Sequence, residues 1–221
     1  MKNLTLIAAA SVLAASAPAY AQSEPGGLSV GVTGGTLGIG PEVGFRISPT
    51  FGIRANATFL GISEDVDSDG IEYNGDLDLQ SYGAMLDVHP FGGGFRISGG
   101  ARIAKNRIGL KATPTEDVEV GNRVFTPAQI GTLTGRIKPK DFAPTLTLGW
   151  GGGLMSGIKF GVDAGVMFQG RPKVTRLSAN GTAASRPEFQ DALAQERLEI
   201  EDDIDDFKLF PILQLSVGYQ F

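Results

Sequence analysis

The stretch that decides the fold is LQLSVGYQF, residues 213–221. Its apolar side chains occupy every second position, and Gln, Ser and Gly fill the positions between them. This period of two is typical of a β-strand with one apolar and one polar face. The last residues of a soluble protein usually fray, so we expect neighbouring strands to hold an apolar segment that ends in Phe221.

Seven further segments repeat the same period. They lie at residues 28–33, 42–48, 51–60, 77–88, 95–104, 145–151 and 158–169. Within 77–88 the apolar parity changes near Gln80 and Ser81, which indicates either a β-bulge or a strand that leaves a bilayer there. Together with 213–221, these segments predict eight strands.

The polar faces of the segments decide between two all-β architectures. Alternation alone also fits a soluble two-sheet sandwich, which carries Lys, Glu and Thr on its outer faces. Here the polar positions are mostly Gly, Ser and Thr with a few charges, which suits a confined lumen. A strand can cross hydrocarbon only when both of its edges are hydrogen-bonded. We therefore predict an eight-stranded antiparallel transmembrane β-barrel, an up-and-down meander with its apolar face toward lipid.

The connections between the segments fall into two length classes. Residues 48–50, 89–94 and 152–157 are short and rich in Pro and Gly, whereas 62–76, 106–141 and 172–206 are long. Short connections follow even-numbered strands and long ones follow odd-numbered strands, apart from a short first connection near residues 36–40. Outer-membrane barrels have short periplasmic turns and longer extracellular loops. We therefore expect the long connections outside the cell and both termini in the periplasm.

The beginning of the chain predicts export. Residues 1–21 combine Lys2, an apolar stretch and the small-residue pattern Ala19-Tyr20-Ala21, as in a cleaved secretory signal peptide. The apolar stretch is shorter than the roughly 20 residues that a helix needs to cross a bilayer. We assign 1–21 to a signal peptide and 22–221 to one barrel domain in the bacterial outer membrane, which must hold together without disulfides because the chain has no cysteine.

These features resemble a known family. A signal peptide, eight alternating segments and a final aromatic residue resemble the small outer-membrane barrels of the OmpA transmembrane domain and OmpX type. The resemblance implies that the barrel-assembly machinery reads the last strand, with its side chains Leu213, Leu215, Val217, Tyr219 and Phe221. HPFGGGFR (89–96) and FTPAQIGTLTG (125–135) are also similar to stretches of uncharacterised proteobacterial barrels. The periplasmic peptidoglycan-binding domain of OmpA has no counterpart here, so the resemblance does not imply wall anchoring.

The lumen of such a barrel is narrow, because eight strands leave an interior that side chains just fill. The alternation of outward and inward side chains along the strands places five positive and three negative side chains in the lumen. They are Glu42, Arg46, Arg54, Asp87, Arg96, Arg102, Lys159 and Asp163. Buried charges are costly unless they pair, so we predict a packed polar network in which Asp87 contacts Arg54 or Arg96. The alternative is a conducting pore gated by these charges, with Arg102 and Asp163 as positions that test it.

Two of the long connections carry most of the acidity. Residues 62–78 hold seven Asp and Glu without Lys or Arg, and 188–206 hold nine. Asp65, Asp67, Asp69 and Asp76 match the spacing of a calcium loop, but the expected flanking helices are missing and the last ligand is Asp rather than Glu. We therefore favour solvated acidic loops that meet the divalent cations of the lipopolysaccharide layer.

The 172–206 connection is predicted to contain a helix. Ser185 is a candidate N-cap with Glu188 as its capping-box partner, and apolar residues then recur at helical spacing at Phe189, Leu193, Ile200 and Ile204. This apolar stripe either packs over the barrel rim or forms a docking surface for another protein or a ligand. VEVGNRVF (118–125) is a candidate hairpin with its turn at Gly121-Asn122.

The sequence offers no catalytic constellation. His89 is the single histidine and lies in a short connection, which argues against an imidazole-based hydrolase. We expect no enzyme activity, no cofactor, no bound metal and no nucleic-acid binding, and a monomeric barrel. The function we expect is that of a structural and surface-interaction protein, which contributes to envelope integrity or adhesion through its long acidic loops. The alternative function is a narrow channel for ions or small solutes.

Overall fold

The computed structural model describes residues 27–68, 71–155 and 157–221. The signal peptide expected at 1–21, and Asp69 of the calcium-loop pattern, lie outside these residues. The elements in chain order are β1 (Leu28–Gly35), β2 (Gly38–Arg46), β3 (Phe51–Ser68), β4 (Ile71–Val88), β5 (Phe95–Ala104), β6 (Arg107–Pro114), β7 (Val118–Val120), β8 (Arg123–Phe125), α1 (Pro127–Ile130), β9 (Leu133–Lys138), β10 (Phe142–Met155), β11 (Ile158–Phe168), β12 (Lys173–Ala179), α2 (Pro187–Asp203) and β13 (Leu209–Gln220).

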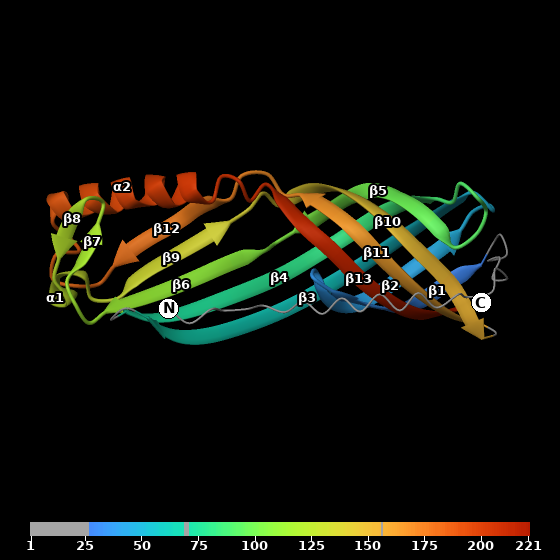
Figure 1. Cartoon of the computed structure of the whole chain (residues 1–221), viewed down its shortest axis with the longest axis horizontal. Helices are drawn as coiled ribbons and strands as arrows, with labels where there is room; N and C mark the ends of the chain where they lie inside the picture. Colours follow the sequence, from blue (N-terminus) through green and yellow to red (C-terminus); the bar gives the residue numbers. More distant parts are fainter. Residues whose placement is uncertain (1–26, 69–70, 156) are drawn as a thin grey trace.

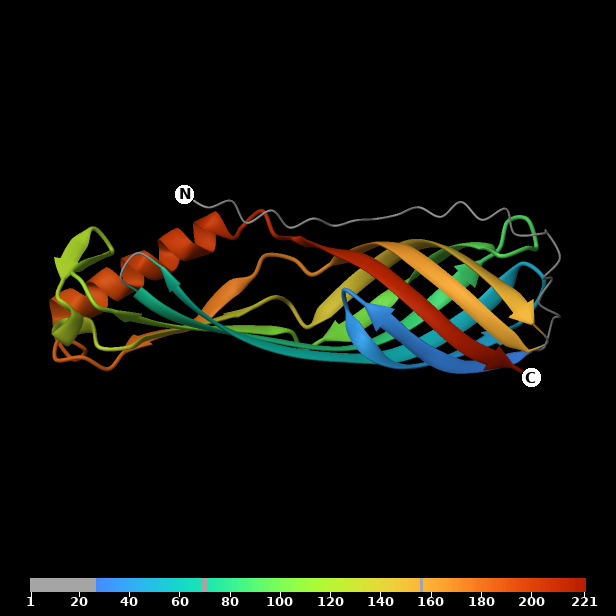
Figure 2. The same cartoon turned by 60° about the horizontal axis from the view of Figure 1, so that its bottom comes forward.

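Eight antiparallel strands form a ring. Their order is β4-β3-β2-β1-β13-β11-β10-β5, and β5 pairs again with β4, so the series of neighbours returns to its start. Each of the eight predicted segments corresponds to one of these strands, although 42–48, 158–169 and 213–221 run one or two residues past the strand ends. The final segment is β13, which pairs with β1 through Val30 and Tyr219 and with β11 through Phe160 and Val217. Figure 2 shows the ring strands tilted around a common axis.

The outer surface of the ring is apolar. The five side chains singled out in β13 and at Phe221 are 46–77% exposed, although all are large hydrophobic residues. Aromatic side chains gather at both ends of the outer surface. One girdle contains Phe59, Tyr82, Phe142 and Phe168, and the other contains Phe45, Phe51, Phe91, Trp150, Tyr219 and Phe221. An apolar band between two aromatic girdles is typical of outer-membrane barrels.

Three of the connections expected as loops instead build a sheet that continues the ring. β3 and β4 are each 18 residues long, and beyond the ring β4 pairs with β6, β6 with β9, and β9 with β12. We call this sheet, together with α1, α2, β7 and β8, the extension. Figure 1 shows the ring at one end of an elongated molecule and the extension at the other. The long connections 62–76, 106–141 and 172–206 were expected as loops with one hairpin and one helix, and the sheet strands that they also contain were not predicted.

The polarity of β3 and β4 inverts where they leave the ring. Within the ring, Ile53 and Leu86 point outward and Arg54 and Asp87 point inward, but beyond Leu60 the outward positions of β3 are polar. The pairing of β3 with β4 runs from Phe51 to Ser68 without a register shift. The parity change near Gln80 therefore marks the point at which β4 leaves the apolar band. The alternative of a β-bulge at that position is wrong.

The far end of the extension has its own apolar core. Val120, Ile130, Ala183, Phe189, Ala192 and Leu193 are buried together there. The hairpin predicted at 118–125 is present as β7 and β8, with positive φ at Gly121 and Asn122. Helix α2 begins at Pro187 with Arg186 as its N-cap, so the expected N-cap at Ser185 is wrong by one residue.

The apolar stripe of α2 does not pack over the barrel rim. Phe189 and Leu193 contact the tip of the extension, where Phe125 meets Phe189 edge to face at a centroid distance of 4.8 Å. Ile200 and Ile204 are only half-buried. The helix therefore stabilises the extension, which the sequence did not predict.

Candidate functional site

The lumen of the ring holds a network of paired charges near its centre. Arg54 Nε donates to Asp87 Oδ2 at 2.6 Å, and Arg54 Nη1 donates to Asp163 Oδ2 at 3.0 Å. Arg96 donates to the same Asp163 through Nε at 3.0 Å and Nη2 at 2.6 Å. The guanidinium groups of Arg54 and Arg96 thus both bind the Asp163 carboxylate in bidentate geometry. Bidentate pairs are the strongest form of charged hydrogen bond. Asp87 lies against Arg54, as the strand parity predicts.

Neutral side chains complete this network. Ser98 Oγ donates to Asp87 at 2.6 Å, and Asn56 Nδ2 donates to Glu42 Oε2 at 3.1 Å. Glu42 also lies 3.5 Å from Arg54 Nη1. The Ser and Asn side chains are needed because each buried carboxylate has more lone pairs than one guanidinium can satisfy.

Arg102 forms a separate arm of the network. It donates to Ser81 Oγ at 2.6 Å and to Asn56 Oδ1 at 2.7 Å, and within the described residues no carboxylate lies within salt-bridge distance of it. Arg102 is 3% exposed. Its charge is therefore stabilised by neutral acceptors and by the more distant Glu42.

Arg46 and Lys159 lie outside the central network. Arg46 is at the end of the ring that carries the turns 47–50 and 89–94, where it donates to the carbonyls of Ser48, Pro49 and Gly92. Lys159 is half-exposed at the same end, and no ion pair to it is found among the described residues. We call this the turn end of the ring. A cavity of about 130 Å³ opens here, lined by Arg46, Lys159 and their neighbours.

His89 fixes the turn end. Arg46 Nη1 lies 2.8 Å from His89 Nε2, and His89 Nδ1 lies 3.1 Å from Gly93 O. An arginine only donates and a carbonyl only accepts, so Nε2 accepts, Nδ1 carries the proton and the ring is neutral. Burial and the nearby Arg46 charge both lower the pKa of His89. This geometry gives His89 a structural role in its turn.

An apolar layer lies at the opposite end of the lumen. Leu37, Ala104, Ala143, Met167 and Ile212 are 0–5% exposed and pack together with Phe210. Between this layer and the charged network the cavity is only about 20 Å³, and holding one water molecule takes about 10–15 Å³. The lumen is thus filled by two successive layers, one charged and one apolar.

Comparison with known proteins gives a fold but no family. No protein-family model and no curated protein matches this chain. Two crystal structures from Acinetobacter baumannii match 90% of it: CarO2 with TM-score 0.64, 20% identity and 100% of that chain covered, and CarO with TM-score 0.58, 21% identity and 99% covered. The fold is similar to that of CarO2.

A third similar structure is a major outer membrane protein from Thermus thermophilus, with TM-score 0.43 and 14% identity over 90% of this chain and 100% of that chain. It is too distant to carry an argument. The likeness to CarO2 and CarO supports the all-β architecture with its ring of eight strands. It does not single out the OmpA or OmpX type that the sequence resembles.

The other sequence-predicted sites lie in the extension. Asp65 and Asp76 of the calcium pattern sit in paired strands and accept hydrogen bonds from Asn74 and Ser63 at 2.9 and 2.8 Å. Among the described residues no group of three or more His, Cys, Asp and Glu could hold a metal ion. In the same residues, every helix is too short or too polar to span a membrane.

Proposed function

We propose that this protein resides in the bacterial outer membrane as a structural barrel with a closed lumen, and that its outward-facing extension is the working surface. The CarO-like fold, the apolar outer surface of the ring and its two aromatic girdles support this location. The extension then stands outside the cell, and the turn end of the ring faces the periplasm. β13 and Phe221 serve as the assembly signal for this barrel.

The observation that carries the proposal is the packing of the lumen in two layers. Arg54, Arg96, Asp87 and Asp163 form one layer, and the apolar layer around Met167 and Ile212 forms the second. An ion that crossed would have to displace paired charges and then enter an apolar constriction. Both steps cost several kcal/mol, about the penalty of removing a charge from its partners or from water.

The extension supplies contact surfaces of two kinds. Ile62, Val66, Ile108 and Leu110 lie on one face of its sheet and are 41–56% exposed. The outward edge formed by β3 and β4 is acidic, with Asp65, Asp67, Glu72, Asp76 and Asp78 exposed. Exposed apolar patches rimmed by polar residues mark interaction sites. The extension is thus suited to contact extracellular protein or neighbouring envelope components, in support of adhesion or envelope integrity.

Planar-bilayer recording tests the closed lumen. The refolded full chain is expected to show no steady conductance in symmetric KCl. The Asp163→Asn variant removes the carboxylate shared by Arg54 and Arg96, and it serves as a comparison. Steady conductance of the unmodified protein that is lost on substitution of Arg102 or Asp163 would overturn the proposal and establish a narrow channel instead.

A further inference from the structure

The cations of this acidic protein are unevenly distributed. The formal net charge is −5, yet 11 of the 19 Lys and Arg lie at 105–140, 171–176 or position 208. Residues 28–80, which form β1 to β3 and most of β4, contain two cations, Arg46 and Arg54. Arg54 points into the lumen, and Arg46 lies at the turn end of the ring. One side of the molecule is therefore basic where the ring meets the extension.

The strand register places six of these cations on one face of the extension sheet. Lys138 lies directly opposite Lys173, and Arg136 lies opposite Arg176. Arg136 also lies opposite Gly109 of β6. Arg107 and Lys111 are two residues before and after Gly109, so their side chains point to the same face as that of Arg136. The other face of these strands carries Ile108, Ile137 and Val174 in one row. We call Arg107, Lys111, Arg136, Lys138, Lys173 and Arg176, together with Lys140 two residues beyond the end of β9, the basic face.

Few carboxylates neutralise the basic face. Lys138 pairs with Asp141 at 2.8 Å, and no other ion pair within 4.0 Å involves this face in the described part of the chain. Asp78 lies opposite Arg107 at the border with β4, but not within that distance. Like charges directly opposite one another destabilise a sheet. Asp141 offsets part of this repulsion at Lys138, whereas Arg136 and Arg176 face each other without a paired carboxylate, so an anion bound between or over them would be stabilising.

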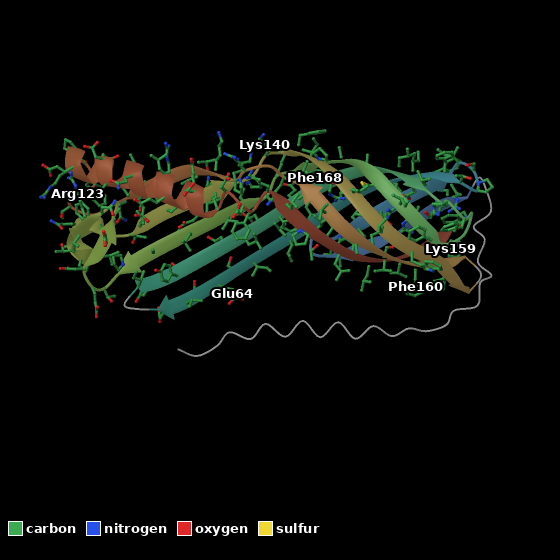
Figure 3. All side chains as sticks on the ribbon, turned by 45° about the horizontal axis from the view of Figure 1, so that its top comes forward. Glu64, Arg123, Lys140, Lys159, Phe160 and Phe168 are labelled. Carbon is green, nitrogen blue, oxygen red and sulfur yellow. The ribbon has the colours of Figure 1, made fainter. Side chains whose placement is uncertain are left out.

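The basic face begins just beyond the aromatic girdle. Lys140 comes two residues before Phe142, and Lys173 comes five residues after Phe168. Figure 3 shows Lys140 beside Phe168 at the junction of ring and extension, whereas Arg123 lies at the far tip and Lys159 at the opposite end of the ring. The girdle marks the edge of the hydrocarbon, so these ammonium groups stand at the level of the lipid headgroups.

The position of Lys140 is defined by its packing. A Cβ atom on Gly170 would lie 2.9 Å from Lys140 Cδ and 3.3 Å from its Cε, so the stem of Lys140 rests on the bare backbone of this glycine. Gly170 also has a φ of +66°. The glycine therefore leaves room for the lysine stem, which carries the ammonium group across the junction.

We propose that the basic face binds the phosphate groups of lipopolysaccharide in the outer leaflet. This inference rests on the proposed orientation, with the extension outside the cell. The phosphates of ordinary phospholipids lie in one plane at the interface. Arg107 and Lys111 are four residues apart along β6, about 13 Å at 3.3 Å per residue, so the cations reach well above that plane. A glycolipid with phosphorylated sugars at several heights matches this spread.

The experiment compares two charge-matched variants of the full chain in phosphatidylcholine nanodiscs. Lys140→Gln/Lys173→Gln removes two cations of the basic face, and Arg123→Gln/Arg197→Gln removes two exposed cations elsewhere on the extension. Lipopolysaccharide binding is titrated by native mass spectrometry, and folding of each variant is checked by heat-modifiable migration on a gel. We expect about tenfold weaker binding for the first variant and less than about twofold for the control, since each cation near an anionic membrane surface contributes separately.

Two further lipids separate the possible sources of phosphate. Dephosphorylated lipopolysaccharide is expected to bind the unmodified protein about tenfold more weakly, with little further loss in the first variant. Equal binding of phosphatidylglycerol and lipopolysaccharide would overturn the assignment in favour of phospholipid headgroups. An equal loss in both variants would overturn it in favour of unspecific attraction. Conductance of the lumen, in contrast, bears on the proposed function and leaves these lipid titrations unaffected.

Discussion

At the scale of single residues, Asp163 holds the lumen network together. It is 6% exposed and is the only carboxylate bonded to Arg96 among the described residues. Asp163→Asn keeps the shape but leaves Arg96 buried without a counter-charge, which is expected to lower the free energy of unfolding by about 3 kcal/mol. Urea unfolding in lipid vesicles measures this loss. The double variant Arg96→Met/Asp163→Leu should lose less, and a larger loss in the double variant would contradict the pairing.

His89 gives the turn end a specific pH dependence. Its pKa is lowered in the folded protein, by burial first and then by the Arg46 charge. In the unfolded chain the value is about 6.5, so the unfolded state binds more protons below that pH. The stability that neutral His89 provides is therefore complete above about pH 6.5 and is lost as the pH falls toward the folded pKa.

His89→Gln tests this dependence, because His89 is the single histidine of the chain. Urea unfolding of the two proteins is compared at pH 7.5, 6.5 and 5.5, so that titration of the carboxylates cancels in the difference. The unmodified protein should lose more stability than the variant, by at most about 1.4 kcal/mol for each unit by which the pKa is lowered. Parallel pH profiles would show that His89 is not held neutral.

At the scale of elements, β3 crosses from an apolar to a polar outer face within a few residues. Ala55 points outward inside the band, and Ser63 points outward beyond it. The chain contains no cysteine, so Ala55→Cys and Ser63→Cys each provide a unique label. We expect aqueous quenchers to reduce the fluorescence of a label on the Ser63→Cys variant. Lipid-attached quenchers should reduce the fluorescence of a label on the Ala55→Cys variant. The same response at both positions would contradict the boundary near Leu60.

The core at the tip of the extension is separate from the ring. Phe189 is fully buried against the edge of Phe125 and near Val120. Phe189→Ala is expected to destabilise this unit by about 3–5 kcal/mol, with local opening rather than loss of the ring. Limited proteolysis should cut the 180–206 region faster, while the heat-modifiable gel shift stays unchanged. Leu198→Ala, at a 60% exposed position of the same helix, is the matched control.

The ring strands could be predicted because lipid outside and a narrow lumen inside impose one rule on every second residue. The strands of the extension could not be predicted in the same way. In β6 and β9 the apolar residues Ile108, Leu110 and Ile137 occupy one face, and the other face is charged. Both faces are partly exposed to water, so the alternation of apolar and polar residues is less regular than in the ring. The parity of the lumen side chains was predictable, but the sharing of Asp163 by Arg54 and Arg96 depends on the register of strands far apart in sequence.

At the scale of the whole molecule, the turn end of the ring and the extension lie at opposite ends. The C-terminal residue is tied to the turn end of the ring, where Phe221 N donates to Leu28 O at 2.9 Å. Figure 1 places this end far from the extension. An epitope inserted after Glu116, in the exposed connection between β6 and β7, therefore lies on the side opposite to an epitope at Gly92.

This separation predicts the outcome of antibody labelling on whole cells. The epitope after Glu116 should be labelled on intact cells, because the extension stands outside the outer membrane in the proposed orientation. The epitope at Gly92 should be labelled only after the outer membrane is permeabilised. Labelling of Gly92 alone on intact cells would reverse the orientation, and with it the assignment of the basic face to the outer leaflet.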